Sequence, residues 1–310
     1  MQAARTRLDA QRWHWQHGPI DIVATAEGEP EAVAAAHEAA WQRLQPLLAT
    51  LVDELPLLRQ PVHAGGANPL RGSVARCMWD ACAPHAAHGF ITPMAAVAGS
   101  VAQALIGAYQ RPGIVRAWLN NGGDIALHLA PGAAVRVGVY GDLARRLGAQ
   151  AAALDGQFDL AAAQPVRGVA TSGWRGRSLS LGIADSVTVL AASAAMADAA
   201  ATVIANAVNA DHPAIVRHPA NELRDDSDLG SRPATAEVPP LPASVVRAAL
   251  QAGASAARAC QQRGLAWAVF MVCQGQRLAL QPLCSMAPAA HGAFATSEPP
   301  CPPASGMVFA

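Results

Sequence analysis

The chain has 310 residues, 52% of them hydrophobic, and its 22 basic side chains balance its 22 acidic ones. That much apolar material can build a sizeable core, and the lack of excess positive charge argues against a nucleic acid or an anionic membrane as partner. No Gly/Ser-rich linker or block of charge divides the sequence. We therefore expect one domain over residues 1–284.

The cysteines and the N-terminal sequence favour a cytoplasmic protein. The six cysteines show neither a CxxC motif nor the Cys/His spacing of a zinc site. The first residues lack the apolar segment of a secretory signal peptide, and no run of about 18 apolar residues could cross a bilayer. We expect free thiols and no membrane segment.

In the first third of the chain, apolar spacing and turn residues predict a strand over 20–27, a helix over 31–51, a loop over 61–72 and a helix over 93–110. Thr92 is the expected N-cap of the last of these helices, and Pro93 fits its first turn, where a missing N–H costs nothing. Because Gly99 has no side chain, that helix can approach a neighbouring element closely.

The sequence then predicts strands over 114–119, 135–140, 168–171 and 179–190 and a helix over 198–206. An irregular excursion with at most one short strand is expected over 209–242, followed by a helix over 243–263 and a hairpin over 265–280 that turns at "QGQ". A Pro-rich stretch ends the chain. That last stretch, residues 285–310, is expected to be a disordered tail. Strands and helices do not alternate strictly, so α+β is the predicted class, with mixed or antiparallel sheets packed against helices.

The motif "NNGGDI" at 120–125 follows an apolar strand. Gly122 and Gly123 could leave a bare backbone surface for a ligand, with Asn120, Asn121 and Asp124 as hydrogen-bonding groups around it. The alternative is an ordinary hairpin turn, since turns favour Asn and Gly.

A second motif, "GVATSGWRGRS" at 168–178, ends another strand in Thr171, Ser172 and Gly173. Arg175 and Arg177 follow within reach of an anionic group, so a phosphate could bind here. The alternative is a polar surface hairpin with two solvated arginines. The motif matches neither the P-loop nor the GxGxxG pattern.

In a third motif, "ADAAAT", Asp198 and Thr202 lie four residues apart and share one face of a helix. A carboxylate and a hydroxyl are hard oxygen ligands for Mg²⁺. The alternative is an aspartate that interacts with the free amides at a helix start.

In this order and spacing, the three motifs resemble those of the ApbE family, flavin transferases that attach FMN from FAD to a threonine of a target protein. The resemblance covers roughly residues 90–208. It implies that Asp198 and Thr202 bind Mg²⁺ and serve catalysis. It also implies a binding pocket for FAD or FMN, which is lined by Asn121, Gly122, Gly123, Asp124, Thr171, Ser172 and Gly173.

The sequence departs from the family pattern in two places. The helix that packs over the nucleotide normally begins with Ala-Lys-Gly, whereas "AVAGS" here places Ala98 before Gly99. A His-x-Ile-Asp-Pro segment precedes the last motif in typical members, whereas this chain reads "SLSLGIADSVTV", in which Asp185 is a candidate substitute for the aspartate. These departures indicate a divergent branch.

Three functions remain open. The first is a Mg²⁺-dependent enzyme that transfers FMN from FAD to a protein acceptor or cleaves the FAD pyrophosphate. The second is an enzyme of cofactor biosynthesis or one-carbon metabolism that uses the same pocket for a pterin or another nucleotide. The third is a flavin-binding protein without turnover.

Several other polar residues are interpreted as structural. His85 and His88 are expected to be exposed in a loop, and His128 and Trp118 to pack beside the "GGD" motif. The acidic run "DDSD" at 225–228 lacks the glycine and distal glutamate of an EF-hand loop and is expected to be solvated.

Overall fold

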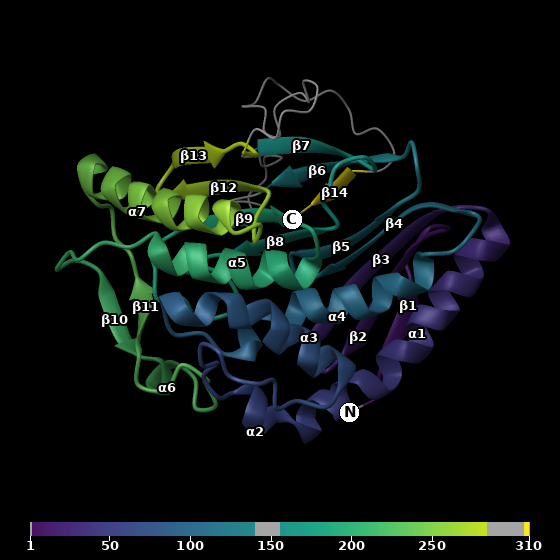
Figure 1. The fold of residues 1–310 in the computed structure, drawn as a ribbon, viewed down its shortest axis with the longest axis horizontal. Helices are drawn as coiled ribbons and strands as arrows, with labels where there is room; N and C mark the ends of the chain where they lie inside the picture. Colours follow the sequence, from purple (N-terminus) through teal and green to yellow (C-terminus); the bar gives the residue numbers. More distant parts are fainter. Residues whose placement is uncertain (1, 140–155, 284–306, 310) are drawn as a thin grey trace.

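The structure, a computed structural model, describes residues 2–139, 156–283 and 307–309 (Figure 1). Its central element is a nine-stranded sheet in the order β1-β2-β3-β4-β5-β8-β9-β12-β13, in which every neighbouring pair is antiparallel. The strands are β1 (Ala4–Arg7), β2 (Arg12–His17), β3 (Ile20–Gly28), β4 (Ile114–Asn121), β5 (Asp124–Leu129), β8 (Gly168–Ser172), β9 (Ser186–Ala191), β12 (Ala268–Cys273) and β13 (Gln276–Leu280).

Helices cover one face of this sheet (Figure 1). They are α1 (Pro30–Asp53), α2 (Leu55–Leu58), α3 (Ser73–Cys82), α4 (Val97–Ile106), α5 (Ala194–Ala207), α6 (Ala220–Leu223) and α7 (Ala243–Gln262), with the 3₁₀ turns η1 (Ala83–His88), η2 (Pro93–Ala96) and η3 (Gly107–Tyr109). Helices α1 and α4 pack on β2 to β5, and α5 and α7 pack on β8, β9 and β12. This packing forms two apolar clusters on the same side of the sheet.

A smaller sheet covers the opposite face. It consists of β14 (Met307–Phe309), β6 (Ala134–Val139) and β7 (Gly156–Ala161), and β14 pairs parallel with β6. Apolar residues of β6 and β7, among them Val137 and Phe158, pack against the outward side of the large sheet. Within the tail expected over 285–310, Met307–Phe309 pair with β6 as β14. Residues 284–306 lie outside the described residues.

The observed class is α+β, as the sequence predicts. The strand expected over 20–27, the helices over 31–51 and 243–263, and the hairpin at "QGQ" are confirmed within a few residues. In that hairpin Gln274 and Gly275 have φ of 45° and 79°, the left-handed conformation that tight hairpin turns require.

Other expectations are wrong. Residues 179–185 form no strand, because the chain there runs along α5 so closely that a Cβ at Gly182 would lie 2.0 Å from the Ala205 carbonyl oxygen. The excursion over 209–242 contains an antiparallel pair, β10 (Val216–Pro219) and β11 (Pro233–Glu237), rather than at most one strand. Thr92 precedes η2, but its hydroxyl does not cap it.

The helices α4 and α5 touch at Gly99. A Cβ added there would lie 2.3 Å from the Ala194 carbonyl oxygen and 2.9 Å from the Cβ of Asp198. Any side chain would therefore push the two helices apart. The close approach that the sequence predicts at Gly99 is confirmed.

Three aromatic residues surround His37, which lies on α1 on the helix side of the sheet. Its Nδ1 is 2.7 Å from the Tyr109 hydroxyl, and its ring contacts the rings of Trp13, Trp15 and Tyr109. Burial lowers the pKa of His37 from 6.5 to about 4. The imidazole is therefore neutral in the native protein at neutral pH.

Among the described residues, no single helix combines the length and apolarity needed to cross a membrane, although the bent pair Ser73–His88 and Pro93–Tyr109 would satisfy the test by length and composition alone. The described cysteines, Cys77, Cys82, Cys260 and Cys273, are free thiols, as expected.

Replacing Gly99 with alanine should lower the free energy of unfolding by about 1–3 kcal/mol, because the new methyl group must displace backbone atoms of α5. Gly89→Ala is the control, since a Cβ at Gly89 would meet no atom within 4 Å. Urea denaturation of both variants measures the difference. Equal stability of the two variants would show that the close contact is not required.

The thermal midpoint should fall as the pH is lowered from about 6.5 to 4, in part because of His37. Within this window the unfolded chain, with its histidine pKa of 6.5, binds more protons than the native protein, so stability is lost with decreasing pH. His37→Phe keeps the ring packing and should show a smaller fall, measured by calorimetry at pH 7 and 4.5. An identical fall in wild type and variant would contradict the assignment.

Candidate functional site

The "NNGGDI" motif is the turn of the β4–β5 hairpin. Asn121 pairs with Asp124 across the two strands, and Gly122 and Gly123 form the turn between them with φ of 68° and 115°. These dihedral angles are strained for residues other than glycine. The turn interpretation of the motif is therefore confirmed.

The two asparagines of this motif have different contacts. Asn120 Oδ1 accepts a hydrogen bond from the Gly123 amide at 2.8 Å and so stabilises the turn. Asn121 Nδ2 donates to the Ala98 carbonyl at 3.1 Å, and its Oδ1 accepts from the Asp21 amide at 3.3 Å. Asn121 thus joins the end of β4 to both α4 and β3.

Asp124 opens β5 on the side of the sheet that faces the helices. Its Oδ1 accepts the backbone amide of Thr171 at 3.2 Å. The hydroxyl of Thr171 lies on the other face of the sheet, where it is 2.9 Å from the Thr188 hydroxyl. Thr171 therefore contributes its amide, not its side chain, to this region, while strand alternation places Ser172 on the helix side.

Asp198 lies in the second turn of α5 and faces α4. Its Oδ2 accepts the Gly99 amide at 2.9 Å. Burial, and then the nearby charge of Asp124, raise the pKa of Asp198 well above its usual range. The N-cap of α5 is Ser193, whose hydroxyl accepts from the Met196 amide, so Asp198 is not a helix-start charge.

Thr202 follows Asp198 one turn later on the same helix. Its hydroxyl donates to the Ala95 carbonyl of η2 at 3.5 Å. Two carboxylates, one hydroxyl and one backbone carbonyl therefore gather between the hairpin turn, α5 and η2. We call this set, Asp124, Asp198, Thr202 and the Ala95 carbonyl, the oxygen cluster.

The oxygen cluster consists of hard oxygen atoms, which are the type of ligand that Mg²⁺ prefers. No group of three or more His, Cys, Asp or Glu side chains able to hold a metal exists among the described residues. Structural zinc sites need such a set, whereas Mg²⁺ is commonly held by one or two carboxylates together with water and phosphate oxygens. Asp198, Thr202 and the Ala95 carbonyl supply hard oxygens of this kind.

Of the two arginines in the second motif, only Arg177 reaches the site. A Cβ at Gly122 would lie 1.6 Å from a guanidinium nitrogen of Arg177, and the Arg177 charge acts to lower the pKa of Asp124 against the larger effect of burial, which raises it. Arg175 instead lies 3.4 Å from Asp185 and 4.9 Å from the Trp174 ring centroid.

Gly173 and Asp185 have packing roles. A Cβ at Gly173 would lie 2.3 Å from the Asp185 carbonyl oxygen, so the glycine allows two chain segments to touch. The Asp185 carboxylate accepts the Gln274 amide at 2.5 Å and the Trp174 indole N–H at 3.3 Å. It is therefore engaged in local structure and does not replace the family aspartate in the oxygen cluster.

Some expected surface residues are buried. His85 is 3% exposed, and burial lowers its pKa to about 4, so the expectation of an exposed histidine is wrong there, whereas His88 is exposed. His128 and Trp118 pack, as expected. In the acidic run, Asp228 is half-buried and accepts the Thr92 hydroxyl, so this residue is not simply solvated.

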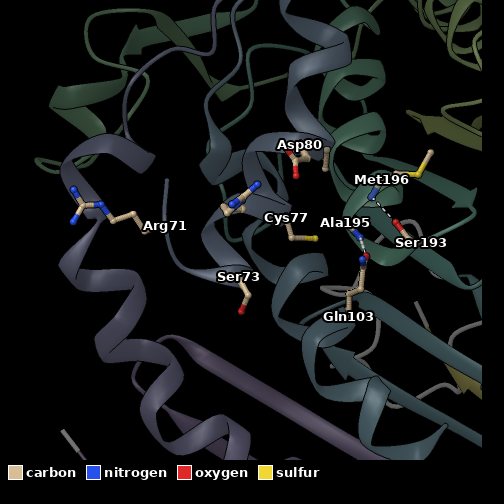
Figure 2. A pocket seen from close by; sticks show the side chains of 10 residues that line it. Arg71, Ser73, Cys77, Asp80, Gln103, Ser193, Ala195 and Met196 are labelled. Carbon is tan, nitrogen blue, oxygen red and sulfur yellow. Dashed lines mark hydrogen bonds between the residues drawn. The ribbon is translucent and has the colours of Figure 1, made fainter. Parts of the chain in front are cut away.

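A cavity of about 670 Å³ lies at the N-terminal end of α5, between residues of α3 and α4 (Figure 2). Its lining includes Arg71 and Cys77 near α3, Gln103 of α4 and Ser193, but neither Asp124 nor Asp198. Gln103 accepts the Ala195 amide, and Ser193 accepts the Met196 amide, so the first amides of α5 are already bonded. The cavity is separate from the cluster.

The amino-acid sequence of this chain is similar to those of several UPF0280 proteins. A UPF0280 protein of Methanosphaerula palustris is 41% identical over 119 residues, which are 38% of this chain and 47% of that protein. A UPF0280 protein of Methanopyrus kandleri is 37% identical over 139 residues, 44% of this chain and 51% of that protein. A UPF0280 protein of Methanoregula boonei is 34% identical over 166 residues, 53% of this chain and 67% of that protein.

The chain thus spans about half the length of the first two of these relatives. A family model described as AbpE bacteria matches residues 4–279, from β1 to β13. This match extends well beyond the three motifs, over nearly the whole described chain. The chain therefore belongs to this ApbE-like family, as its motifs predict.

Proposed function

We propose that the protein is a Mg²⁺-dependent enzyme that uses FAD, either transferring FMN to an acceptor or cleaving the FAD pyrophosphate. The observation that carries the proposal is the oxygen cluster, in which Asp124 and Asp198 lie close enough for the charge of one to raise the pKa of the other. A divalent cation would relieve this repulsion. Membership in an ApbE-like family supports a flavin-related function in general.

The proposed metal ligands are Asp198, Thr202 and the Ala95 carbonyl. The Gly99 amide of α4 holds Oδ2 of Asp198, and the Thr202 hydroxyl, on the same face of α5, contacts η2. Mg²⁺ bound there would neutralise negative charge on the pyrophosphate as it is cleaved. Water and phosphate oxygens would supply the other ligands.

In the proposed reaction, FMN is transferred from FAD to an acceptor oxygen. The acceptor oxygen forms a bond to the phosphorus of the FMN half, the bond from that phosphorus to the AMP oxygen breaks, and AMP leaves. The acceptor hydroxyl must lose its proton, and Asp124, held by the Thr171 amide next to Asp198, is the proposed proton acceptor. Water in place of a protein hydroxyl gives the pyrophosphatase reaction.

The nucleotide phosphates are proposed to lie along the hairpin turn. Nothing lies within 4 Å of a Cβ built at Gly123, so its backbone is open to a ligand, and Arg177 beside Gly122 offers positive charge. Ser172 and Gly173 follow at the end of β8 and are proposed to complete this wall. Asn121 contributes by fixing the turn to α4.

The second candidate is an enzyme of cofactor biosynthesis or one-carbon metabolism that binds a pterin or another nucleotide in the same place. The departures from the family pattern favour it: Ala98 stands where typical members carry lysine, and Asp185 is engaged in local contacts. A flavin-binding protein without turnover is the third candidate. The retained pair Asp198 and Thr202 argues against it, since a pure binder has less use for a metal site.

Nucleotide affinity should depend on Mg²⁺ and on Asp198. Asp198→Ala should abolish the Mg²⁺ dependence, and Thr202→Val should weaken it, because each removes one proposed oxygen ligand. Thr171→Val is the matched control, since the Thr171 hydroxyl faces away from the cluster toward Thr188. Calorimetric titration of FAD, FMN, ADP and a pterin, each with and without Mg²⁺, measures these effects.

If the affinity of the wild type for FAD were the same with and without Mg²⁺, the transferase proposal would be contradicted and the flavin-binding candidate would be left. Binding of the pterin with no binding of FAD or FMN would favour the second candidate. Production of AMP from FAD, followed by chromatography, would then separate turnover from binding.

Arg177→Ala should weaken nucleotide binding roughly 10-fold, since one charge-assisted hydrogen bond contributes about 1.5–3 kcal/mol. Arg175→Ala is the control, because Arg175 is directed to Asp185 and Trp174 instead. The same titration compares the two variants. Equal losses in both, or no loss in either, would show that the phosphates lie elsewhere.

A further inference from the structure

A segment between α6 and β11 contacts both Thr92, which precedes η2, and the loop that carries Arg177. It comprises residues 224–232, and we call it the strap. Hydrogen bonds between Ala220 and Arg232, and between Asn221 and Gly230, close its base. None of its residues belongs to the motifs that define the proposed site. Its contacts are therefore a separate observation.

On the helix side, the strap meets η2 through Asp228. The buried Thr92 hydroxyl donates to the Asp228 carboxylate. The Thr92 carbonyl in turn accepts the Ala95 amide at 3.1 Å, and the Ala95 carbonyl accepts the Thr202 hydroxyl at 3.5 Å. A continuous series of hydrogen bonds thus runs from Asp228 to the oxygen cluster.

On the sheet side, the strap meets the loop that carries Arg177. Arg224 donates from Nη2 to the Arg177 carbonyl at 2.9 Å. Arg177 itself lies against the hairpin turn at Gly122. The strap thereby connects both walls of the proposed nucleotide site.

Two further contacts fix the strap at a distance from the cluster. Asp226 Oδ2 lies 2.6 Å from Arg59 Nη2 in a solvent-exposed ion pair. The Arg232 guanidinium lies 3.3 Å from the Phe90 ring centroid, a cation–π contact. Of these strap residues, Asp228 is the one whose side chain bonds to Thr92, the residue that precedes η2.

The turn that Asp228 contacts is one that needs external support. A 3₁₀ turn has poorer hydrogen-bond geometry than an α-helix, so the short η2 turn is more easily distorted than a full helix. The Thr92 side chain does not cap the turn, because its hydroxyl is directed to Asp228. The orientation of the Ala95 carbonyl consequently depends on how firmly Thr92 is held.

We propose that Asp228 is a positioning residue for the metal site: by holding Thr92, it fixes the η2 turn that presents the Ala95 carbonyl beside Thr202. The inference rests on the proposed function, since it assigns the Ala95 carbonyl to Mg²⁺. Asp228 touches neither metal nor nucleotide in this assignment. It acts through Thr92 and the backbone of η2.

The test uses the full chain with two disrupting variants, Asp228→Ala and Thr92→Val. Both should weaken Mg²⁺ binding about 10-fold, the lower range for loss of a group that orients a metal ligand, and both should speed hydrogen exchange at the Ala95 amide. Thr92→Ser retains the hydroxyl and should restore both properties. Asp226→Ala is the matched strap control and should leave both near wild type.

Calorimetry with MgCl₂ and hydrogen exchange read by mass spectrometry give separate answers. Unchanged Mg²⁺ affinity in Asp228→Ala and Thr92→Val would overturn the proposal, even if exchange became faster. A loss of affinity as large in Asp226→Ala would also overturn it, because the effect would then belong to the strap as a whole. If wild type bound no Mg²⁺, the proposed function would fail, and unchanged Ala95 exchange would show separately that Asp228 does not hold η2.

Discussion

The close contact between α4 and α5 at Gly99 is the constraint on which the proposed site depends. Because Gly99 has no side chain, its amide reaches Asp198, and the α4 backbone lies directly against α5. The same contact brings η2, at the start of α4, to Thr202. A larger residue at this position would separate the ligands that the two helices contribute.

The hairpin turn supplies the other half of the site. Asn121 bonds to the Ala98 carbonyl, one residue before Gly99, so the end of β4 and α4 are fixed to each other. Asp124 then enters the region from β5 and meets Asp198. Placing two acids together in a half-buried environment is unfavourable without a cation. This unfavourable arrangement is what we interpret as a functional feature.

Local patterns account for much of the fold. Helical spacing identifies α1, α5 and α7, and the glycine pairs and asparagines identify the turns, because these signals depend on neighbours in the sequence. The four-residue spacing of Asp198 and Thr202 likewise places both on one helical face. By contrast, β1 and β2 show a weak pattern, with exposed residues throughout β1.

The missed parts of the site depend on tertiary contacts. The meeting of Asp124 with Asp198 follows from helix packing on the sheet, which no local motif specifies. A backbone carbonyl such as that of Ala95 has no signature in the sequence, and neither does the contact between Asp228 and Thr92. Side chains alternate between the two faces of a strand, and Ala170 lies in the apolar cluster on the helix side. The Thr171 hydroxyl therefore lies on the other face, away from the proposed site.

We propose that the oxygen cluster binds a divalent cation together with a nucleotide pyrophosphate. A crystal structure of the protein with Mn²⁺ and ADP tests it most directly, because the anomalous signal of Mn²⁺ locates the ion without assumptions. We expect an anomalous peak within bonding distance of Asp198, Thr202 and the Ala95 carbonyl, with phosphate oxygens beside Gly123. A well-ordered nucleotide elsewhere, or a peak that avoids Asp198, would contradict it.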